Sequence, residues 1–363
     1  MKLPPLLKKR SGMQGPLSPA NWRGGRRLLA CETDGFVFRA AVVALNEGKA
    51  TIERCAESRA IDLKEAVSEV IAALKKSAVD LPRHAICLSP GVMTAMLELP
   101  LKEGKARSER EMQELIRWEM EPLFAQQVSR WNLGAILLGR GHLNQDQREK
   151  IILASRGTTG KEGARFGELA IELGMVTRTQ VEEALQLQEH LQVMDDKLLC
   201  GWSAPPDTGE HTGWLCCAVG KESLQRFRDA FAHHHIRLDW LYPQIGPSLA
   251  ALSTKEGGIF PVLEMQQGMV ACVLGESGTI TGMQFTQGSG ERLSVGDCLE
   301  VCHALLRTSM TTLWLSGSYA GHPVLLKQLE ERLDRPVKPI PVVFKNSDTP
   351  QWSVAGLFGA SMH

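Results

Sequence analysis

One order of predicted elements occurs twice along the chain: three strands joined by short turns, then an amphipathic helix and a buried strand. The first copy has strands at 28–32, 36–45, 50–55 and 85–88 and a helix at 61–74. The second has strands at 259–264, 269–274, 279–285 and 312–315 and helices at 297–308 and 322–333. Between them, the pattern predicts strands at 197–202, 213–219 and 238–242 and helices at 221–234 and just before Leu252. This duplication predicts an α/β protein with one sheet in each half.

The composition excludes several classes of protein. The chain has 363 residues, and its 41 basic side chains balance 41 acidic ones, so no overall field favours nucleic acid as a partner. The longest apolar runs fall far short of the ~20 residues that a membrane-spanning helix needs. Nine cysteines lie in apolar runs without the spacing of a secreted disulfide scaffold, which predicts reduced thiols and a cytoplasmic protein.

Residues 1–27 are predicted to form a separate N-terminal arm. The first 31 residues hold seven basic side chains and no acidic one, and prolines and glycines interrupt them. They have neither the apolar core nor the cleavage site of a signal peptide. We expect a disordered arm, and two interpretations of its charge stay open: peripheral contact with an anionic inner membrane, or a solvated tail.

A long helix is predicted to begin after Ser108. Glu111 stands three residues later and completes a capping box, in which the two side chains bond the first free backbone N–H groups. Pro122 is predicted to end or bend the helix. The side chains predicted to point inward are Met112, Leu115, Ile116, Trp118 and Met120.

Two glycine-punctuated helical motifs lie between residues 132 and 188. In the second motif, a short helix is predicted from about Phe166 to Leu173, followed by a left-handed turn at Gly174. Thr177 then caps another helix, with Gln180 at the position that completes a capping box. The first motif repeats the order of glycines and most apolar positions.

The duplicated order resembles the actin-like, ribonuclease H-like fold of FtsA and of the PilM/MshI proteins of type IV and MSHA pilus assembly. Residues 108–122 (SEREMQELIRWEMEP) resemble that family's helix with an Arg-Trp-Glu run before a proline, and 220–231 and 313–333 resemble two of its other helical segments.

The resemblance implies an actin-like domain at 28–127 and 196–363, with a small all-α insert at 128–195. It also implies a partner, the cytoplasmic segment of a PilN-type inner-membrane protein. The assembly ATPase of the pilus or of a type II secretion system is a further candidate partner.

A nucleotide site of the actin-like kind needs small turn residues with free backbone amides and an acidic group near Mg²⁺. The first phosphate turn, 32–36, contains the bulky Phe36, and the second, 264–268, lacks the Asp-Gly-Ser/Thr pattern. Only the adenosine-side turn at 315–320 is partly kept. We therefore expect a pseudo-actin scaffold without ATP as a cofactor.

The second glycine motif resembles the repeat of the MshEN domain, the cyclic-di-GMP-binding N-terminal domain of MSHA and type II secretion ATPases. The resemblance implies that cyclic-di-GMP binds to both motifs. The implied contacts of the second motif are Arg165, Phe166, Gly167, Ala170, Gly174, Met175, Val176, Val181, Leu185 and Gln188. Those of the first are Leu133, Gly134, Leu137, Gly141, Leu143 and Ile152.

The first motif departs from the repeat at three positions. Asn132 replaces the arginine, Arg148 replaces an apolar residue, and Ser155 replaces the glutamine. Arg130, Arg148 and Arg156 are the candidates for the missing charge. The alternative is an insert that kept the helical fold, lost the ligand and now docks a partner.

Other candidate sites favour structural roles. Cys298, Cys302 and His303 lack a second ligand pair at zinc spacing, and the histidines at 233–235 follow one another at a helix end. No catalytic motif stands in a convincing setting, so we expect no enzyme. The expected function is a cytoplasmic assembly scaffold regulated by cyclic-di-GMP. Two alternatives stay open: an ATP-binding actin-like protein, and an adaptor that binds no nucleotide.

Overall fold

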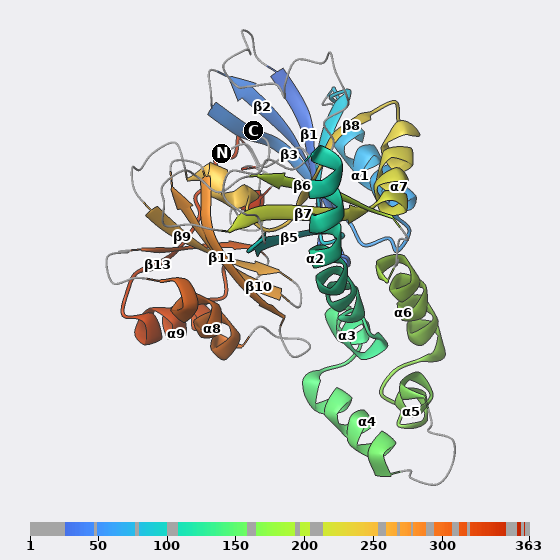
Figure 1. Cartoon of the computed structure of the whole chain (residues 1–363). Coiled ribbons are helices and arrows are strands. Elements are labelled where there is room, and N and C mark those ends of the chain that lie inside the picture. Colours follow the sequence, from blue (N-terminus) through green and yellow to red (C-terminus); the bar gives the residue numbers. More distant parts are fainter. Residues whose placement is uncertain are drawn as a thin grey trace.

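The computed structural model describes residues 26–46, 49–76, 80–99, 108–157, 165–192, 197–203, 213–252, 259–266, 269–276, 279–287, 294–306, 312–317, 320–345, 354–356 and 359. All but the last two residues of the predicted N-terminal arm lie outside these ranges. Figure 1 shows two sheet-containing lobes and a helical insert that extends away from them. Within the described residues, no helix combines the length and the apolar character needed to cross a bilayer.

The first lobe is built on a five-stranded sheet of order β3-β2-β1-β4-β8. Its strands are β1 (Arg26–Thr33), β2 (Phe38–Asn46), β3 (Lys49–Ser58), β4 (His84–Ser89) and β8 (Arg237–Pro243). β1 pairs antiparallel with β2 across a short turn and parallel with β4 after a helical crossover. The helices α1 (Leu63–Lys76) and α7 (Lys221–Ala232) pack with the strands in one core.

The second lobe repeats this arrangement in the order β11-β10-β9-β12-β13. Its strands are β9 (Ile259–Gln266), β10 (Met269–Glu276), β11 (Thr279–Gln287), β12 (Leu313–Gly317) and β13 (Val337–Pro339). The helices α8 (Val295–Leu305) and α9 (Pro323–Leu333) pack on this sheet, and Cys298 and Cys302 are buried in that core, as predicted. A further core joins the two lobes through the short helix η2 (Pro247–Ala251). This duplication confirms the predicted actin-like fold.

A third, smaller sheet of order β5-β7-β6 belongs to the first lobe. Its strands are β5 (Val92–Leu97), β6 (Leu198–Ser203) and β7 (Trp214–Gly220). The long helix α2 (Glu109–Ser129) covers it and begins with the predicted capping box of Ser108 and Glu111. The lobes and this sheet are called the frame below.

The prediction for Trp118 in α2 was wrong, and of the two alternatives for Pro122 the ending of the helix is excluded. Trp118 does not point inward: its side chain is 72% exposed, because it lies on the face opposite Met112 and Met120. The helix also continues through Pro122 to Ser129. Buried apolar side chains continue beyond the proline, at Phe124 for example, so packing on the small sheet outweighs the backbone hydrogen bond that the proline cannot donate.

The insert consists of four helices between α2 and β6: α3 (Leu133–Gly139), α4 (Gln145–Gly157), α5 (Phe166–Glu172) and α6 (Arg178–Leu191). They form two helix-turn-helix copies. The predicted left-handed turn is confirmed at Gly174, with φ of 64°, and Gly141 has φ of 76° in the first copy. Thr177 and Gln180 form the predicted capping box, and the first copy has the same box at its corresponding residues.

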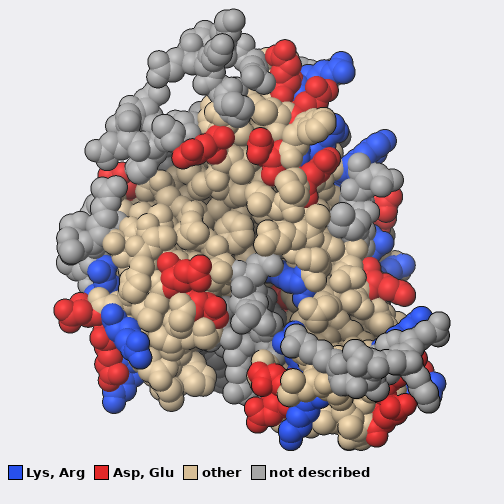
Figure 2. All heavy atoms as spheres, turned by 60° about the horizontal axis from the view of Figure 1, so that its bottom comes forward, with Lys and Arg blue, Asp and Glu red and all other residues tan. Residues whose placement is uncertain are grey.

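Charged side chains of both signs are mixed over the face shown in Figure 2. They surround a central area of mostly uncharged residues. This mixture agrees with the balanced charge of the sequence.

Candidate binding sites in the frame and the insert

The turn at 33–37 corresponds to the first phosphate turn of the resembling fold, and it is closed on itself. The backbone N–H of Gly35 donates to Thr33 Oγ1 at 3.1 Å, and those of Phe36 and Val37 donate to Asp34 Oδ1, each at 2.9 Å. The N–H of Asp34 donates to the carbonyl of Val37 at 3.3 Å. The backbone donors that a phosphate would need are therefore already paired within the turn.

Two buried glutamates stand near the ends of corresponding strands, Glu32 on β1 and Glu264 on β9. Burial raises the pKa of each carboxyl to about 7. Glu264 accepts hydrogen bonds from the backbone N–H of Gly246 at 2.8 Å and from the Ser248 hydroxyl. Gln244 Nε2 donates to the carbonyl of Thr33, the last residue of β1, at 2.7 Å. The segment that links the lobes therefore satisfies polar groups of both strands.

The other two turns of the resembling nucleotide site are only partly described. Residues 267–268 and 318–319 lie outside the described ranges. Gly317 has φ of 97°, and an added Cβ there would collide with the carbonyl oxygen of Met265. This glycine allows β12 to lie close to β9, so strand packing alone accounts for the glycine at this position. Among the described residues, no group of three or more histidine, cysteine or acidic side chains is placed to hold a metal ion.

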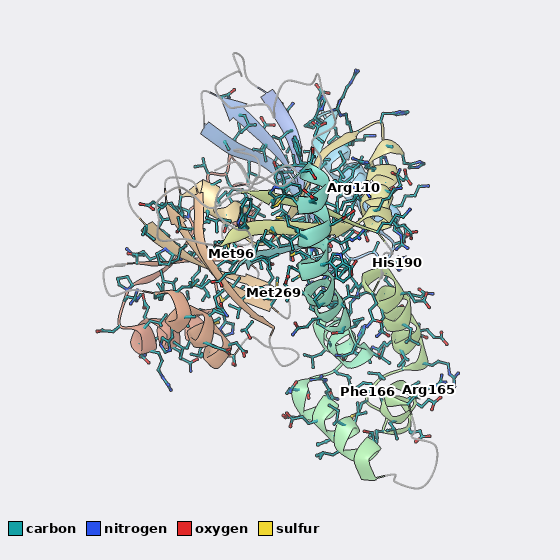
Figure 3. All side chains as sticks on the ribbon, viewed as in Figure 1. Met96, Arg110, Arg165, Phe166, His190 and Met269 are labelled. Carbon is teal, nitrogen blue, oxygen red and sulfur yellow. The ribbon has the colours of Figure 1, made fainter. Side chains whose placement is uncertain are left out.

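The two motifs of the insert pack on one another reciprocally. α3 of the first copy contacts α6 of the second, and α5 contacts α4. A methyl group added at Gly134 would lie 3.2 Å from the Phe166 ring, and one added at Gly167 would lie 3.2 Å from Leu133. The structure thus brings the beginnings of both motifs together (Figure 3). Each copy places a large apolar side chain on the glycine of the other.

Five of the predicted ligand contacts have side chains in the core of the insert. At most 7% of each is exposed: Leu137, Leu143, Ala170, Val176 and Val181. They pack against one another and against buried residues of all four helices. These five side chains therefore stabilise the fold of the insert and support the residues on its surface.

Gly134 and Gly167 are also buried. The other predicted contacts retain accessible surface. Arg165, Gly141 and Gly174 are exposed, and Leu185 is 43% exposed. Leu133, Ile152, Phe166, Met175 and Gln188 are partly buried. Their contacts with cyclic-di-GMP stay predictions.

One of the three arginines considered for the missing charge lies beside the first motif. The Nε of Arg148 would be 3.1 Å from a methyl group added at Gly134. Arg130 instead lies over the Trp131 ring, 4.3 Å from its centroid, and burial lowers the pKa of its guanidinium to about 10. The side chain of Arg156 lies outside the described residues.

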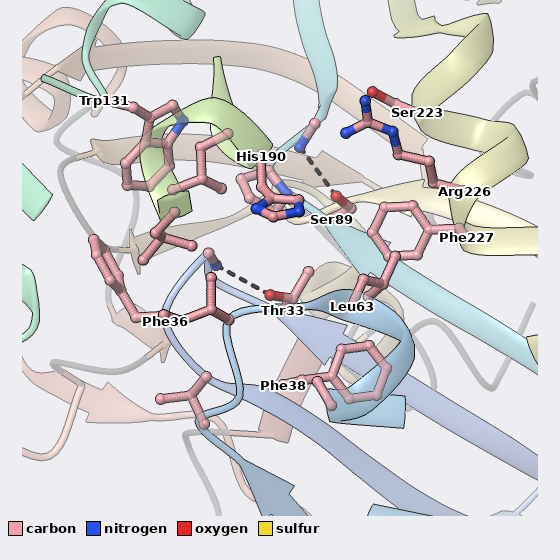
Figure 4. A pocket seen from close by; sticks show the side chains of 18 of the residues that line it. Thr33, Phe36, Phe38, Leu63, Ser89, Trp131, His190, Ser223, Arg226 and Phe227 are labelled. Carbon is pink, nitrogen blue, oxygen red and sulfur yellow. Dashed lines mark hydrogen bonds between the residues drawn. The ribbon is translucent and has the colours of Figure 1, made fainter. Parts of the chain in front are cut away.

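A pocket that the sequence did not predict lies where the insert meets the frame (Figure 4). Its cavity volume is about 130 Å³. Its aromatic lining consists of Phe36, Phe38, Phe124, Trp131 and Phe227. The insert contributes one wall through Leu187, His190 and Leu191 of α6. A concave site lined mainly by aromatic and aliphatic side chains with a few polar groups is a candidate binding site.

The basic side chains of the lining are Arg226 from α7 and His190 from α6. Figure 4 shows the Arg226 guanidinium next to Ser223, above the aromatic lining. Arg226 is exposed, so its guanidinium can donate hydrogen bonds to a molecule bound at the pocket.

The insert is attached to the frame at the closed turn. The Trp131 ring meets the Phe36 ring edge-on, with 5.5 Å between centroids. Leu191 packs against the same turn. At the other end of α3, Arg140 Nη1 donates to the carbonyl of Arg59 at 3.0 Å. The insert therefore packs on the closed turn at 33–37.

Solved structures with a similar fold are known, although no similar sequence was found. No protein-family model and no curated protein sequence matches the chain. Among solved structures, a PilM-PilN type IV pilus biogenesis complex is 12% identical, with a TM-score of 0.53 over 92% of this chain and 97% of that one. The cytoplasmic domain of EpsL, an inner-membrane component of the Vibrio cholerae type II secretion system, is 8% identical, with a TM-score of 0.42 over 93% and 94%. At such identities the likeness concerns the fold.

Proposed function

We propose that this protein is a non-enzymatic scaffold of a type IV pilus, MSHA pilus or type II secretion system, located in the cytoplasm at the inner membrane. The likeness in fold to a PilM-PilN type IV pilus biogenesis complex supports this choice of system. The observation that carries the proposal is the preformed aromatic pocket between the insert and the frame. It offers a docking site that requires no nucleotide.

In this proposal, the pocket holds a short cytoplasmic segment of a PilN-type membrane protein. An extended segment needs apolar space for its side chains and hydrogen-bond donors for its backbone carbonyls. The aromatic lining supplies the space, and Arg226 supplies donors. A bulky apolar side chain anchored among aromatic rings is typical of the residues that dominate binding energy.

The insert in this proposal binds cyclic-di-GMP and regulates assembly. Support comes from the exposed Arg165 at the start of the second motif and from the close approach of the two motif beginnings. Arg148 stands beside Gly134 and adds a guanidinium to the first copy. Guanidinium groups suit both phosphate oxygens and the edge of guanine.

The closed turn at 33–37 argues against ATP as the ligand of the frame. Its amides are paired internally, and the insert covers it through Trp131. A titration with MgATP distinguishes the alternatives. The proposal predicts no saturable binding of ATP at concentrations up to the millimolar range, whereas micromolar binding would favour an ATP-dependent actin-like protein.

The partner assignment is tested with a synthetic peptide that carries the cytoplasmic segment of the PilN-type protein of the same organism. We expect it to bind the wild type, and Arg226→Glu to weaken binding by roughly tenfold or more, because truncating or reversing a desolvated charge at an interface costs at least ~1.4 kcal/mol. Arg228→Glu, on the same helix but outside the pocket, is the matched control and should bind normally. No binding by the wild type, or equal loss in both variants, would refute the assignment.

A further inference from the structure

The carbonyl oxygen of Trp131 accepts two hydrogen bonds from a single helix. Gln188 Nε2 and Gln192 Nε2 both donate to it, each at 2.9 Å. Gln188 lies in the last turn of α6, and Gln192 is its C-cap residue. Two amide side chains, one turn apart, therefore fasten the end of α6 to the chain segment between α2 and α3.

The residue held in this way is also part of the pocket. The Trp131 ring lines the pocket and packs edge-on against Phe36 of the closed turn. The same end of α6 contributes His190 and Leu191 to the pocket wall. The two glutamines and the Trp131 carbonyl, called the amide clamp below, thus hold the wall that the insert adds to the frame.

Gln188 is also the residue that the second motif would use for its ligand. A glutamine amide has two N–H groups and one carbonyl oxygen, and the Trp131 carbonyl uses only one N–H group of Gln188. The other two groups stay available to a ligand without breaking the clamp. A ligand bonded to the second N–H and the carbonyl oxygen of Gln188 holds the side-chain amide in the orientation that donates to Trp131. Hydrogen bonds linked in this way strengthen one another.

We propose that the pocket is a composite interaction surface whose insert wall is held by the amide clamp, and that a ligand on Gln188 tightens this wall and raises the affinity of the pocket for its partner. The second half of this inference rests on the proposed function, since it takes cyclic-di-GMP as the ligand and a PilN-type segment as the partner. The first half concerns the protein alone.

The clamp is tested by hydrogen exchange in the full-length protein without any ligand. The readout is the exchange rate of the backbone amides of residues 35–37, which are hydrogen-bonded within the turn that the insert covers. In the double variant Gln188→Ala, Gln192→Ala, we expect these amides to exchange roughly tenfold faster or more, because two hydrogen bonds that oppose local opening are lost.

The matched control is Gln186→Ala, an exposed glutamine on α6 that does not contact Trp131. It should leave the exchange of residues 35–37 unchanged. If the double variant exchanges like the control, the clamp does not hold the wall and the inference is overturned.

The coupling is tested with the peptide titration in the presence and absence of cyclic-di-GMP. Tighter peptide binding by about fivefold or more in the wild type, with no such gain in Gln188→Ala, is the expected result. Two ligands that both bind but do not affect one another would refute the coupling and leave the proposed function intact. If either ligand fails to bind the wild type, the proposed function is refuted. The hydrogen-exchange experiment uses no ligand and still tests the amide clamp in that case.

Discussion

The frame and the insert are both duplications. The two lobes of the frame have the same polar residue at a corresponding position, whereas the two copies of the insert differ at their polar motif positions. The two lobes of the frame have matching buried glutamates, Glu32 and Glu264, and Glu264 accepts a hydrogen bond from the segment between the lobes. The two copies of the insert have kept glycine turns and capping boxes but differ in their motif polar groups. Ser155 stands where the second copy has Gln188.

This comparison distinguishes residues that stabilise a fold from candidate ligand-binding residues. Both copies of the insert have a left-handed turn that ends the short helix and a capped start of the next helix, and both features stabilise the helical pair. Only the second copy retains the charged and amide groups that the MshEN-like repeat implies. In the frame, by contrast, both glutamates are buried, and the protein itself donates hydrogen bonds to the carboxyl of Glu264.

Disrupting the apolar core of the insert should have the largest effect on stability. Leu137 is fully buried, and its counterpart in the second copy is the small Ala170. We expect Leu137→Ala to lower the free energy of unfolding of the insert by about 2–5 kcal/mol, because it leaves a cavity. Chemical denaturation measures this change. Leu153→Ala, at a side chain that is 64% exposed, should cost far less, and equal losses would mean that the insert has no cooperative core of its own.

The buried glutamates of the frame predict a dependence of stability on pH. Burial raises the pKa of Glu32 from 4.5 to about 7, so the folded state binds the proton more tightly than the unfolded state does. Stability from this group is therefore full below pH 4.5 and is lost as the pH rises to about 7. Glu32→Gln should be more stable than the wild type at pH 8 by roughly 1–3 kcal/mol and similar at pH 5.

Denaturant titrations at the two pH values check this prediction. Glu65→Gln, at an exposed position of α1, is the control and should follow the wild type at both. A Glu32→Gln variant that keeps the full pH dependence of the wild type would show that neither this group nor its ionisation limits the stability of the frame.

The paired glycines of the insert should respond unequally to the same substitution. A methyl group at Gly167 would lie 3.0 Å from Cγ1 of the buried Val181, whereas one at Gly134 would first meet the flexible end of Arg148. We expect Gly167→Ala to cost about 1–3 kcal/mol, because the core must rearrange, and Gly134→Ala to cost less. Thermal unfolding of both variants measures the difference, and a larger loss at Gly134 would contradict the packing described above.

The two capping boxes should contribute alike, which is the smallest expected difference. Thr177→Ala and Asn144→Ala each remove a side chain that accepts a hydrogen bond from the first turn of a helix. Each should cost about 1 kcal/mol in stability. If Asn144→Ala leaves the unfolding midpoint unchanged while Thr177→Ala lowers it, the first copy does not depend on its cap.

The sequence predicted the frame well because each signal was local. Periodic apolar residues, short turns and the Ser108 capping box identify elements without reference to the rest of the chain. The error at Trp118 arose because the spacing of apolar residues does not say which face of the helix the small sheet covers. Trp118 lies within that spacing but on the outer face, and Pro122 interrupts a helix that packing keeps intact.

The pocket was not predictable in the same way. It combines residues from β1, α2, α6 and α7, which lie far apart in the sequence and meet only in the folded protein. One signal was available: Trp131 is a large aromatic residue between two predicted helices, where an exposed loop would place a polar one. The second motif identified Gln188 as a polar group with a role, and the structure shows the Trp131 carbonyl as its partner.

The account depends most directly on whether the insert binds cyclic-di-GMP through its second copy. Calorimetric titration of cyclic-di-GMP is the measurement, applied to the wild type, to Arg165→Ala with Gln188→Ala, and to the matched first-copy variant Asn132→Ser with Ser155→Ala. We predict micromolar binding by the wild type, severe loss in the second-copy variant and a much smaller loss in the first-copy variant. No binding by the wild type, or undiminished binding by the second-copy variant, would contradict the account.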